Sequence, residues 1–319
     1  MNRAGVGSAS EQPARGAAER TAQRHGITAG FSAYALWGVF PLVFRLLEEV
    51  SAVEILFHRI AWSLAVVLGV LAVQHRYAEL ATLVRHRRSL QRLALAAVFI
   101  SINWLTYIWA VNSGHVVDAA LGYYVNPLFT VALGVIVLHE RLRPAQKVAL
   151  GFGVASVLVL TVANGRVPWI ALVLAGSFGM YGYLKKDAGA AALTSLAIET
   201  AVLAPVALVG LAVFAGRGEL SFTNGSLWRD ALLAGLGVVT AVPLLLFATA
   251  ATRIPLSMLG LLQYITPTMQ LIVGVAILGE SLPPARLAGF ALVWIALTVL
   301  ATDAVQSERR SRRIAVEPV

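Results

Sequence analysis

The amino-acid sequence predicts an all-α polytopic membrane protein with ten transmembrane helices arranged as two inverted five-helix repeats. Three observations predict this fold class: bilayer-length apolar stretches recur along the chain, basic residues concentrate in alternate connections, and the second half repeats motifs of the first. Hydrophobic residues make up 58% of the 319 residues and charged residues 13%, whereas soluble domains contain about 45–50% and about 25%. The apolar excess therefore indicates contact with lipid.

The predicted spans have the length of about 20 residues that a helix needs to cross a hydrocarbon core of about 30 Å. We expect a disordered cytoplasmic tail at 1-25 and a cytoplasmic basic tail at 305-319, and the first of these lacks the apolar core of a secretory signal. The ten spans cover residues 26–46, 52–74, 91–112, 115–138, 145–164, 167–185, 190–214, 229–251, 255–279 and 284–304.

Lysine and arginine are distributed unevenly between the two sets of connecting segments. With the amino terminus inside, nineteen lie in the inner segments and five in the outer segments. The positive-inside rule therefore predicts that both termini lie in the cytoplasm. The formal charge of +9 is thus a topology signal, and we expect no nucleic-acid partner. Cysteine is absent, which excludes disulfides and thiolate metal sites.

The two halves of the chain share an internal repeat. The stretch NPLFTVALGVIVLHERLRPA starts at Asn126 and aligns without a gap with TPTMQLIVGVAILGESLPPA, which starts 140 residues later at Thr266. AYALWG in the first half matches SFGMYG in the second. We therefore assign five spans each to a first repeat, 26-164, and a second repeat, 165-304. An odd number of spans inverts one half relative to the other, which is typical of alternating-access transporters with a site near the midplane.

The second span carries three ionisable side chains in its first third, Glu54, His58 and Arg59. A charged side chain at the centre of a membrane helix costs about 2.5–3.5 kcal/mol on insertion scales, so it usually faces protein or water. Glu199 lies in the corresponding span of the second half. We predict that Glu199 pairs with this group across the interface between the halves and forms a gate. A structural ion pair or a capping interaction is the alternative.

A second polar group lies on the third and fourth spans. Asn103 and Tyr107 are four residues apart and share a helix face, while Asp118 and Asn126 belong to a polar stripe on the next span. Trp104 adds aromatic surface. These side chains either line a substrate cavity or join helices through hydrogen bonds.

In the second half, Gln263, Thr266 and Gln270 follow one stripe that is interrupted by a proline. A proline inside a span frees backbone carbonyls and often borders the site in transporters, and a packing kink is the alternative. Glu140 and Glu280 end equivalent spans, and we interpret them as helix-terminus and turn residues.

Four motifs together resemble the RarD proteins, bacterial members of the EamA group in the drug/metabolite transporter superfamily. They are AYALWGVFPLVFR, EILFHRIAWS, NWLTYIWAVNSG followed by LGYYVNP, and GLLQYITPT. The resemblance covers about residues 26–305 and implies a ten-helix inner-membrane carrier, with a cavity lined mainly by the first four helices of each half. It also implies the family label of chloramphenicol sensitivity. The chain departs from the family pattern at Asp118, His139 and Arg45, where glutamate, glycine and lysine are common.

The expected function is that of a secondary transporter that exports a small metabolite or drug-like molecule by alternating access, with proton coupling left open. Carboxylates would carry the proton, His58 and Arg59 would bind an anionic group, amides and Tyr107 would orient the substrate, and tryptophans would form apolar walls. The candidate substrate-binding or coupling residues are Glu54, His58, Arg59, Asn103, Tyr107, Asp118, Asn126, Glu199, Gln263, Trp37 and Trp104.

Two other classes stay open, a membrane-embedded enzyme acting on lipid or prenyl substrates and a non-transporting membrane partner. The sequence HERLR lacks the second histidine of a zinc helix, and neither a phosphate-binding P-loop nor a nucleophile elbow is present. We therefore expect no enzyme activity, no cofactor and no metal. The expected partners are a small-molecule substrate and the lipid bilayer of the inner membrane, and a homodimer is left open.

Overall fold

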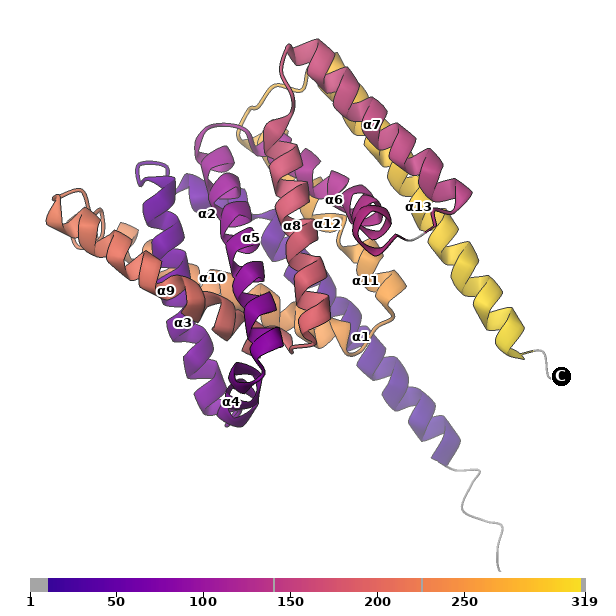
Figure 1. Ribbon diagram of the computed structural model, residues 1–319, viewed down its shortest axis with the longest axis horizontal. Helices are drawn as coiled ribbons and strands as arrows, with labels where there is room; N and C mark the ends of the chain where they lie inside the picture. Colours follow the sequence, from indigo (N-terminus) through magenta and orange to yellow (C-terminus); the bar gives the residue numbers. More distant parts are fainter. Residues whose placement is uncertain (1–10, 140, 225, 317–319) are drawn as a thin grey trace, which may run out of the picture.

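The computed structural model describes residues 11–316 except 140 and 225, and all regular elements in these residues are helices (Figure 1). In chain order the elements are α1 (Glu11–Gly38), α2 (Phe40–Arg45), α3 (Ala52–Val73), α4 (Tyr77–Arg85), α5 (Arg87–Asn112), α6 (Val116–Leu138), α7 (Pro144–Asn164), α8 (Trp169–Ala188), α9 (Ala192–Gly216), α10 (Leu227–Ala251), α11 (Leu256–Leu262), α12 (Ile265–Ile272), the π-helix η1 (Val273–Ile277) and α13 (Pro284–Val316).

Nine segments within the described residues are helical, long and apolar enough to cross a membrane. They correspond to all the predicted spans except the sixth. That span is α8, which has 20 residues but carries Lys185 and Lys186 in its last turn, so its apolar part ends before the helix does. The structure therefore agrees with an all-helical polytopic membrane protein.

Helix boundaries differ from the prediction at both ends of the chain. Helix α1 begins at Glu11 and α13 continues to Val316, so both extend into the predicted tails. Alanine, glutamate and arginine are frequent in these segments and favour helix. Residues 1–10 and 317–319 of the predicted tails lie outside the described residues.

Two predicted spans are broken into shorter helices. The first is divided between α1 and α2, where Pro41 stands in the first turn of α2. The ninth is divided between α11 and α12, with Pro267 close to the start of α12. Proline has no N–H to donate and its ring clashes with the carbonyl four residues earlier, so a helix ends or restarts near it. The break between α11 and α12 agrees with the predicted interruption of the ninth span, whereas the break between α1 and α2 was not predicted.

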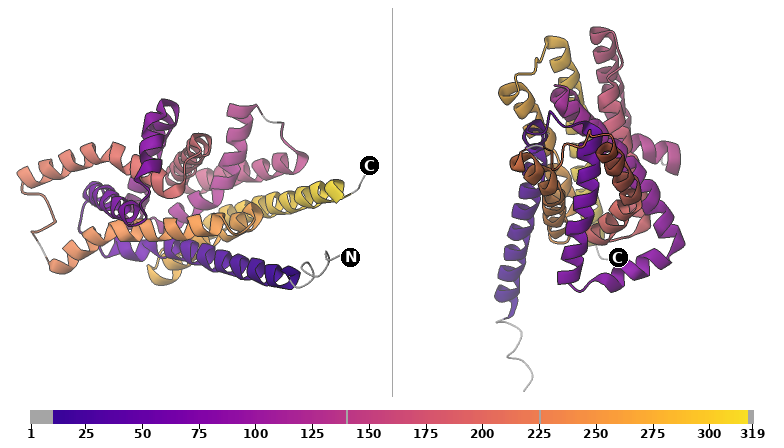
Figure 2. Two further views of the ribbon diagram at one scale, coloured as in Figure 1. Left: turned by 90° about the horizontal axis from the view of Figure 1, so that it is seen from below. Right: turned by 90° about the vertical axis from the view of Figure 1, so that its left-hand side faces the viewer.

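The helices of the two halves pack against each other throughout. Helix α3 packs on α9 and α10, α1 packs on α10 and α12, and α8 packs on α5 and α6. Helices α7 and α13 form a pair that runs along one side of the molecule (Figure 1). The first described turns of α1 and the last turns of α13 lie at the same end of the bundle (Figure 2).

A glycine lets helices of opposite halves come close at the centre. A Cβ atom on Gly237 of α10 would lie 2.4 Å from the carbonyl oxygen of Trp62 in α3. Small residues at such contacts are typical of membrane helix packing. The next turn of α10 carries Thr240, so this close approach places Thr240 beside the polar side chains of α3.

Candidate functional site

Arg59 is buried near the middle of the molecule and is surrounded by aromatic rings. It lies on α3 and is 4% exposed. Its Cζ atom is 4.0 Å from the ring centroid of Trp104 and 5.7 and 5.9 Å from those of Phe44 and Phe40, which is the geometry of cation–π interaction. Its Nε atom donates a hydrogen bond of 3.0 Å to Oγ1 of Thr240 on α10. Arg59 therefore joins the two halves of the chain.

Among the described residues, no carboxylate forms an ion pair with Arg59, and no acceptor is hydrogen-bonded to its two terminal guanidinium nitrogens. The predicted pair with Glu199 is wrong. Glu199 lies 3.3 Å from Nζ of Lys185 and accepts a hydrogen bond of 3.1 Å from the Tyr181 hydroxyl. Only a short turn separates α8 from α9, so chain connectivity brings Lys185 to the first turns of α9.

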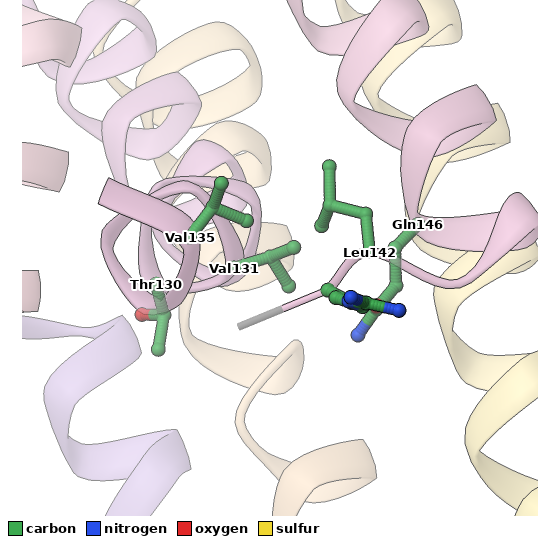
Figure 3. Close-up of a pocket in the computed structure, with 6 residues that line it drawn as sticks. Thr130, Val131, Val135, Leu142 and Gln146 are labelled. Atoms are coloured by element: carbon green, nitrogen blue, oxygen red, sulfur yellow. The ribbon is translucent and has the colours of Figure 1, made fainter. Parts of the chain in front are cut away.

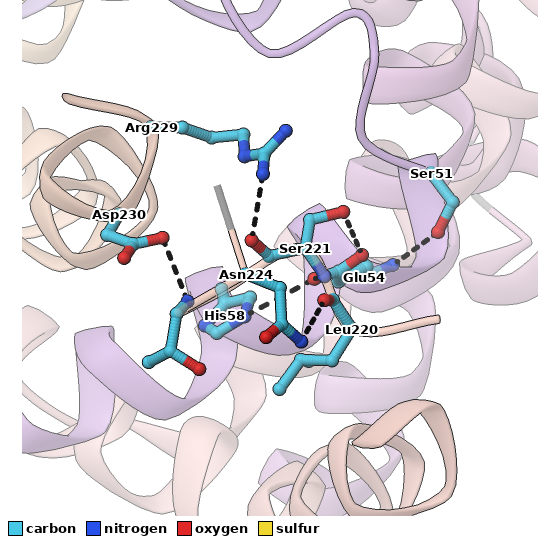
Figure 4. A network of polar contacts seen from close by, with 9 residues as sticks. Ser51, Glu54, His58, Leu220, Ser221, Asn224, Arg229 and Asp230 are labelled. Atoms are coloured by element: carbon cyan, nitrogen blue, oxygen red, sulfur yellow. Dashed lines mark hydrogen bonds and ion pairs between the residues drawn. The ribbon is translucent and has the colours of Figure 1, made fainter. Parts of the chain in front are cut away.

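Glu54 and His58 form a separate group at the start of α3 (Figure 4). The Glu54 carboxylate is buried and accepts hydrogen bonds from the backbone N–H of Ser221, at 2.7 Å, and from its hydroxyl, at 3.0 Å. Nε2 of His58 is 3.8 Å from Oε1 of Glu54. Ser221 belongs to the loop between α9 and α10, which Arg229 and Asp230 also bind. This group fits the capping alternative, because it ties a helix of one half to a loop of the other.

Tyr107 connects the surroundings of Arg59 to the broken ninth span. It is 3% exposed, and its ring packs edge-on against Phe44 with 5.9 Å between centroids. Its hydroxyl accepts a hydrogen bond of 3.0 Å from Nε2 of Gln270 on α12, and the same Nε2 lies 3.3 Å from the carbonyl oxygen of Trp37. One continuous set of contacts therefore joins α1, α2, α3, α5 and α12.

Asn103 holds three helices together one turn before Tyr107. Its Nδ2 atom donates to the Leu174 carbonyl and to the Ser177 hydroxyl on α8, both at 3.1 Å. Its Oδ1 atom accepts a hydrogen bond of 3.2 Å from the Tyr123 hydroxyl on α6. All its polar atoms are thus occupied within the protein, which fits the helix-joining alternative.

We call these connected side chains the central polar cluster. The cluster contains residues from both halves, and the helix breaks at α2 and α12 lie next to it. Oε1 of Gln270 is buried and has no hydrogen-bond partner among the described residues. The cluster thus offers one buried cation and one unused buried acceptor. Its members are Arg59, Asn103, Tyr107, Tyr123, Thr240 and Gln270, with aromatic walls formed by Phe40, Phe44 and Trp104.

Three further predicted residues, like Glu54, His58 and Glu199, lie apart from the central polar cluster. Asp118 stands in the first turn of α6, where its Oδ1 atom is 3.7 Å from Nη2 of Arg286. Oδ1 of Asn126 faces Gly179 of α8 and has no hydrogen-bond partner in the described part of the chain. Gln263 ends α11 at the break of the ninth span. Periodicity placed these residues on polar stripes, but it does not fix which helix a stripe meets.

Glu280 caps a helix of the other half. Its carboxylate accepts hydrogen bonds from the backbone N–H groups of Val116, at 2.6 Å, and Val117, at 2.9 Å, at the start of α6. This agrees with the prediction of a helix-terminus residue, although the helix that it caps was not predicted. Glu140, its repeat equivalent, lies outside the described residues.

A hollow of about 190 Å³ lies apart from the central polar cluster, between the end of α6 and the start of α7 (Figure 3). None of its lining residues belongs to the cluster, so the hollow is separate from the candidate site. They are Thr130, Val131, Val135, Arg141, Leu142 and Gln146.

Comparison with known proteins decides the family. Residues 24–162 match the model of the EamA-like transporter family. The chain is 50% identical to protein RarD of Streptomyces exfoliatus over 290 residues, which are 91% of this chain and 92% of that protein. The chain belongs to the RarD proteins of the EamA family. Protein RarD of Escherichia coli is 39% identical over 91% of this chain and 98% of its own length, and an uncharacterized transporter of Pseudomonas aeruginosa is 43% identical over 90% and 96%.

The fold of this RarD-family chain also has a solved counterpart. A crystal structure with 18% sequence identity superimposes with a TM-score of 0.58 and covers 89% of this chain and 98% of its own. At that identity the likeness concerns the fold alone. Together with the apolar helices, the family places this chain among multi-pass membrane transporters, as the sequence motifs predicted.

Proposed function

We propose that this chain is a secondary transporter of a small organic molecule in the bacterial inner membrane, and that the central polar cluster is its substrate site. Arg59 carries the proposal. A charge that is 4% exposed and has no carboxylate partner in the described residues is costly in a membrane protein, and such residues mark substrate or ion pathways. Arg59 also lies where transporter sites are expected, between the two halves.

The packing of the helices supports ten spans in two inverted repeats. Contacts between the halves have counterparts in which the equivalent helices change places. Helix α1 packs on α10 as its equivalent α8 packs on α5, and α6 packs on α8 as its equivalent α12 packs on α1. Such exchange is expected of halves related by a pseudo-two-fold axis. The first described turns of α1 and the last turns of α13 lie at the same end of the bundle. The chain between them therefore crosses the membrane an even number of times, which favours counting α8 as the tenth span.

We propose that the described conformation is closed around the site. The side chains of the central polar cluster are largely buried, and the bond between Glu54 and Ser221 closes the end that the basic residues predict to be outer. Transport then requires this bond to break when the site opens to the outside. Rocking of one half against the other would supply that motion.

Glu199 is our candidate for the coupling proton. It is 1% exposed and is held by Lys185 and Tyr181, so protonation would release Lys185 and weaken the contact between α8 and α9. Buried carboxylates within spans are frequent members of proton relays. We propose export as the direction of transport, as expected from the sequence.

Transport by the purified protein in liposomes tests the function. Protein-containing and protein-free liposomes would carry an internal pH dye and an imposed pH gradient, and radiolabelled amino acids, organic anions, nucleobases and phenicols would be offered in turn. Phenicols are included because a relative in Pseudomonas aeruginosa, 27% identical, is named chloramphenicol-sensitive protein RarD.

We expect saturable movement of at least one solute, a loss of more than about tenfold in Arg59→Ala, and loss of the coupled pH change in Glu199→Gln. Glu219→Ala serves as a control because Glu219 is exposed in the loop after α9. Movement no faster than in protein-free liposomes for every solute would contradict the proposed function.

A further inference from the structure

We propose that the molecule bound by the central polar cluster is a small monocarboxylate with a flat apolar body, and that the guanidinium of Arg59 binds its carboxylate. This inference rests on the proposed function, because it takes the bound anion to be the transported molecule. It adds the chemical class of the substrate, which neither the family nor the names of relatives gives.

The hydrogen bonds of Arg59 leave the carboxylate-binding edge of its guanidinium unused. An arginine has five N–H donors in a planar fork, and only the Nε donor has an acceptor in the described residues, Thr240. The remaining donors on the two terminal nitrogens match the two oxygens of a carboxylate. Because Thr240 holds Nε, the plane of the fork is fixed before an anion arrives.

Trp104 restricts the direction from which the anion reaches Arg59. The indole ring lies 4.0 Å from Cζ and covers one face of the guanidinium. Phe40 and Phe44 lie within 6 Å of the same atom. An anion would therefore approach in the plane of the fork, which is the geometry of a bidentate pair. The rings would contact an apolar, flat body attached to the carboxylate.

The charges in the described part of the chain favour a single negative charge. Two half-buried cations on the spans are neutralised by carboxylates, Lys185 by Glu199 and Arg286 by Asp118. Arg59 alone supplies a positive charge to the central polar cluster. A monocarboxylate would neutralise it, whereas a phosphate dianion would leave an uncompensated charge in an apolar interior, which is strongly unfavourable.

Gln270 adds a preference for a hydrogen-bond donor on the same molecule. Its Nε2 atom is occupied by Tyr107 and Trp37, while its buried Oε1 atom has no donor among the described residues. A buried acceptor without a hydrogen bond destabilises the protein, because it has lost its water partners without replacement. A hydroxyl, amine or amide group on the substrate would satisfy it, so a hydroxylated aromatic acid fits the cluster better than an unsubstituted one.

Binding to the purified full-length protein in lipid nanodiscs tests the inference without transport. The probes are benzoate, phenylacetate and 4-hydroxybenzoate, each paired with its uncharged amide, and inorganic phosphate. The readouts are the thermal unfolding midpoint and the quenching of tryptophan fluorescence. We expect the carboxylates to raise the midpoint saturably, since a ligand that binds only the folded state stabilises it, and the amides and phosphate to leave it unchanged.

Variants assign the effect to Arg59. We expect Arg59→Lys, which keeps the charge but loses the fork, to weaken carboxylate binding at least tenfold, and Arg59→Gln to abolish it. Thr240→Val, which leaves the guanidinium in place, should weaken binding less than either. Arg217→Gln is the matched control, because Arg217 is exposed after α9. If Arg59→Gln does not fold, Arg59→Lys and Thr240→Val still decide the question.

The outcomes separate this inference from the proposed function. Equal stabilisation by acids and amides, binding that survives Arg59→Gln, or no effect of any carboxylate would overturn the monocarboxylate site. Saturable transport of a neutral solute under those results would leave the proposed function standing. Carboxylate binding that depends on Arg59 but is accompanied by no solute movement in liposomes would instead uphold the site and contradict the transporter.

Discussion

At the scale of single residues, helix face separates ionisable groups that stand close together in the sequence. His58 lies four residues after Glu54 and on the same face of α3, whereas its neighbour Arg59 points about 100° further round the helix. Glu54 lies in the first turn of α3 and can reach a loop, so Ser221 satisfies its carboxylate. Arg59 follows five residues later and lies among aromatic rings instead. One span thus carries an anchoring carboxylate near its end and a cation without an ion-pair partner in the described residues deeper in the bundle.

Lys185 and Glu199 behave as a pair, and a double-mutant cycle measures this. We expect Lys185→Met to lower the thermal unfolding midpoint in detergent more than the double variant Lys185→Met/Glu199→Gln does. The physical reason is that the single change leaves Glu199, which is 1% exposed, without its cation, and an unpaired buried charge is strongly destabilising.

Lys186→Met is the matched control for this cycle, because Lys186 is the exposed neighbour on the same helix. Its substitution should leave the midpoint nearly unchanged. Additive effects of the Lys185 and Glu199 changes would contradict the pairing.

At the scale of elements, the ends of equivalent helices use different residues for the same backbone conformation. His139 ends α6 with φ +52°, in the left-handed region, and its repeat equivalent Gly279 has φ +71°. Left-handed backbone is unfavourable for residues other than glycine. This explains in physical terms why the family pattern, as the resemblance has it, favours glycine at the position of His139.

We therefore predict that His139→Gly stabilises the protein. Relief of left-handed strain is worth about 1–2 kcal/mol, and the greater freedom of glycine in the unfolded chain offsets about 0.5–1 kcal/mol of it. A net gain of roughly 0.5–1 kcal/mol should raise the unfolding midpoint, measured in detergent. Gly279→Ala is the reciprocal change and should lower it. A lower midpoint for His139→Gly would show that the histidine side chain contributes more than the backbone.

The contact between α3 and α10 depends on a missing side chain. An alanine Cβ at Gly237 would lie 2.4 Å from the Trp62 carbonyl oxygen, so Gly237→Ala must separate the helices. Overpacking of this kind costs about 1–3 kcal/mol. We expect a lower unfolding midpoint and slower transport, because Thr240 would move away from Arg59.

Gly235 provides the control on the same helix. A Cβ atom there has no neighbour within 4 Å, and alanine favours helix over glycine by about 1 kcal/mol. Gly235→Ala should therefore leave the midpoint unchanged or raise it. Similar effects of the two substitutions would mean that helix propensity, and not the approach of α3 to α10, governs this segment.

Sequence patterns predicted the elements better than their partners. Span length and hydropathy follow from the thickness of the bilayer, so nine predicted spans appear among the described helices. The pairing of Arg59 with Thr240 joins residues 181 positions apart, and periodicity gives a helix face without naming what that face meets. For the same reason two predicted site residues, Arg59 and Tyr107, lie together in the central polar cluster, while Glu199 was given the wrong partner.

At the scale of the whole molecule, the two halves meet in three groups of polar contacts that share no side chain. Glu54 and Ser221 join them at one end, the central polar cluster joins them in the middle, and Glu280 caps α6 at the start of that helix. Each contact links segments that are far apart in the sequence. A motion of one half against the other would therefore break several polar contacts together, and together these contacts hold the closed conformation.

The bond between Glu54 and Ser221 allows a direct test of this motion. The chain has no cysteine, so Glu54→Cys and Ser221→Cys introduce the only thiols. A short reagent with two reducible thiol-reactive groups would bridge them across the halves. We expect bridging to stop transport in liposomes and reduction to restore it, because the proposed mechanism requires this end to open in every cycle. The comparison is with the same double variant before treatment, so any effect of losing the Glu54 carboxylate is already included.

Arg76→Cys/Glu79→Cys is the matched control, since these side chains bond each other within one segment of the first half and a bridge there restrains no motion between the halves. Undiminished transport by the bridged Glu54→Cys/Ser221→Cys protein would mean that the two halves do not separate at this end.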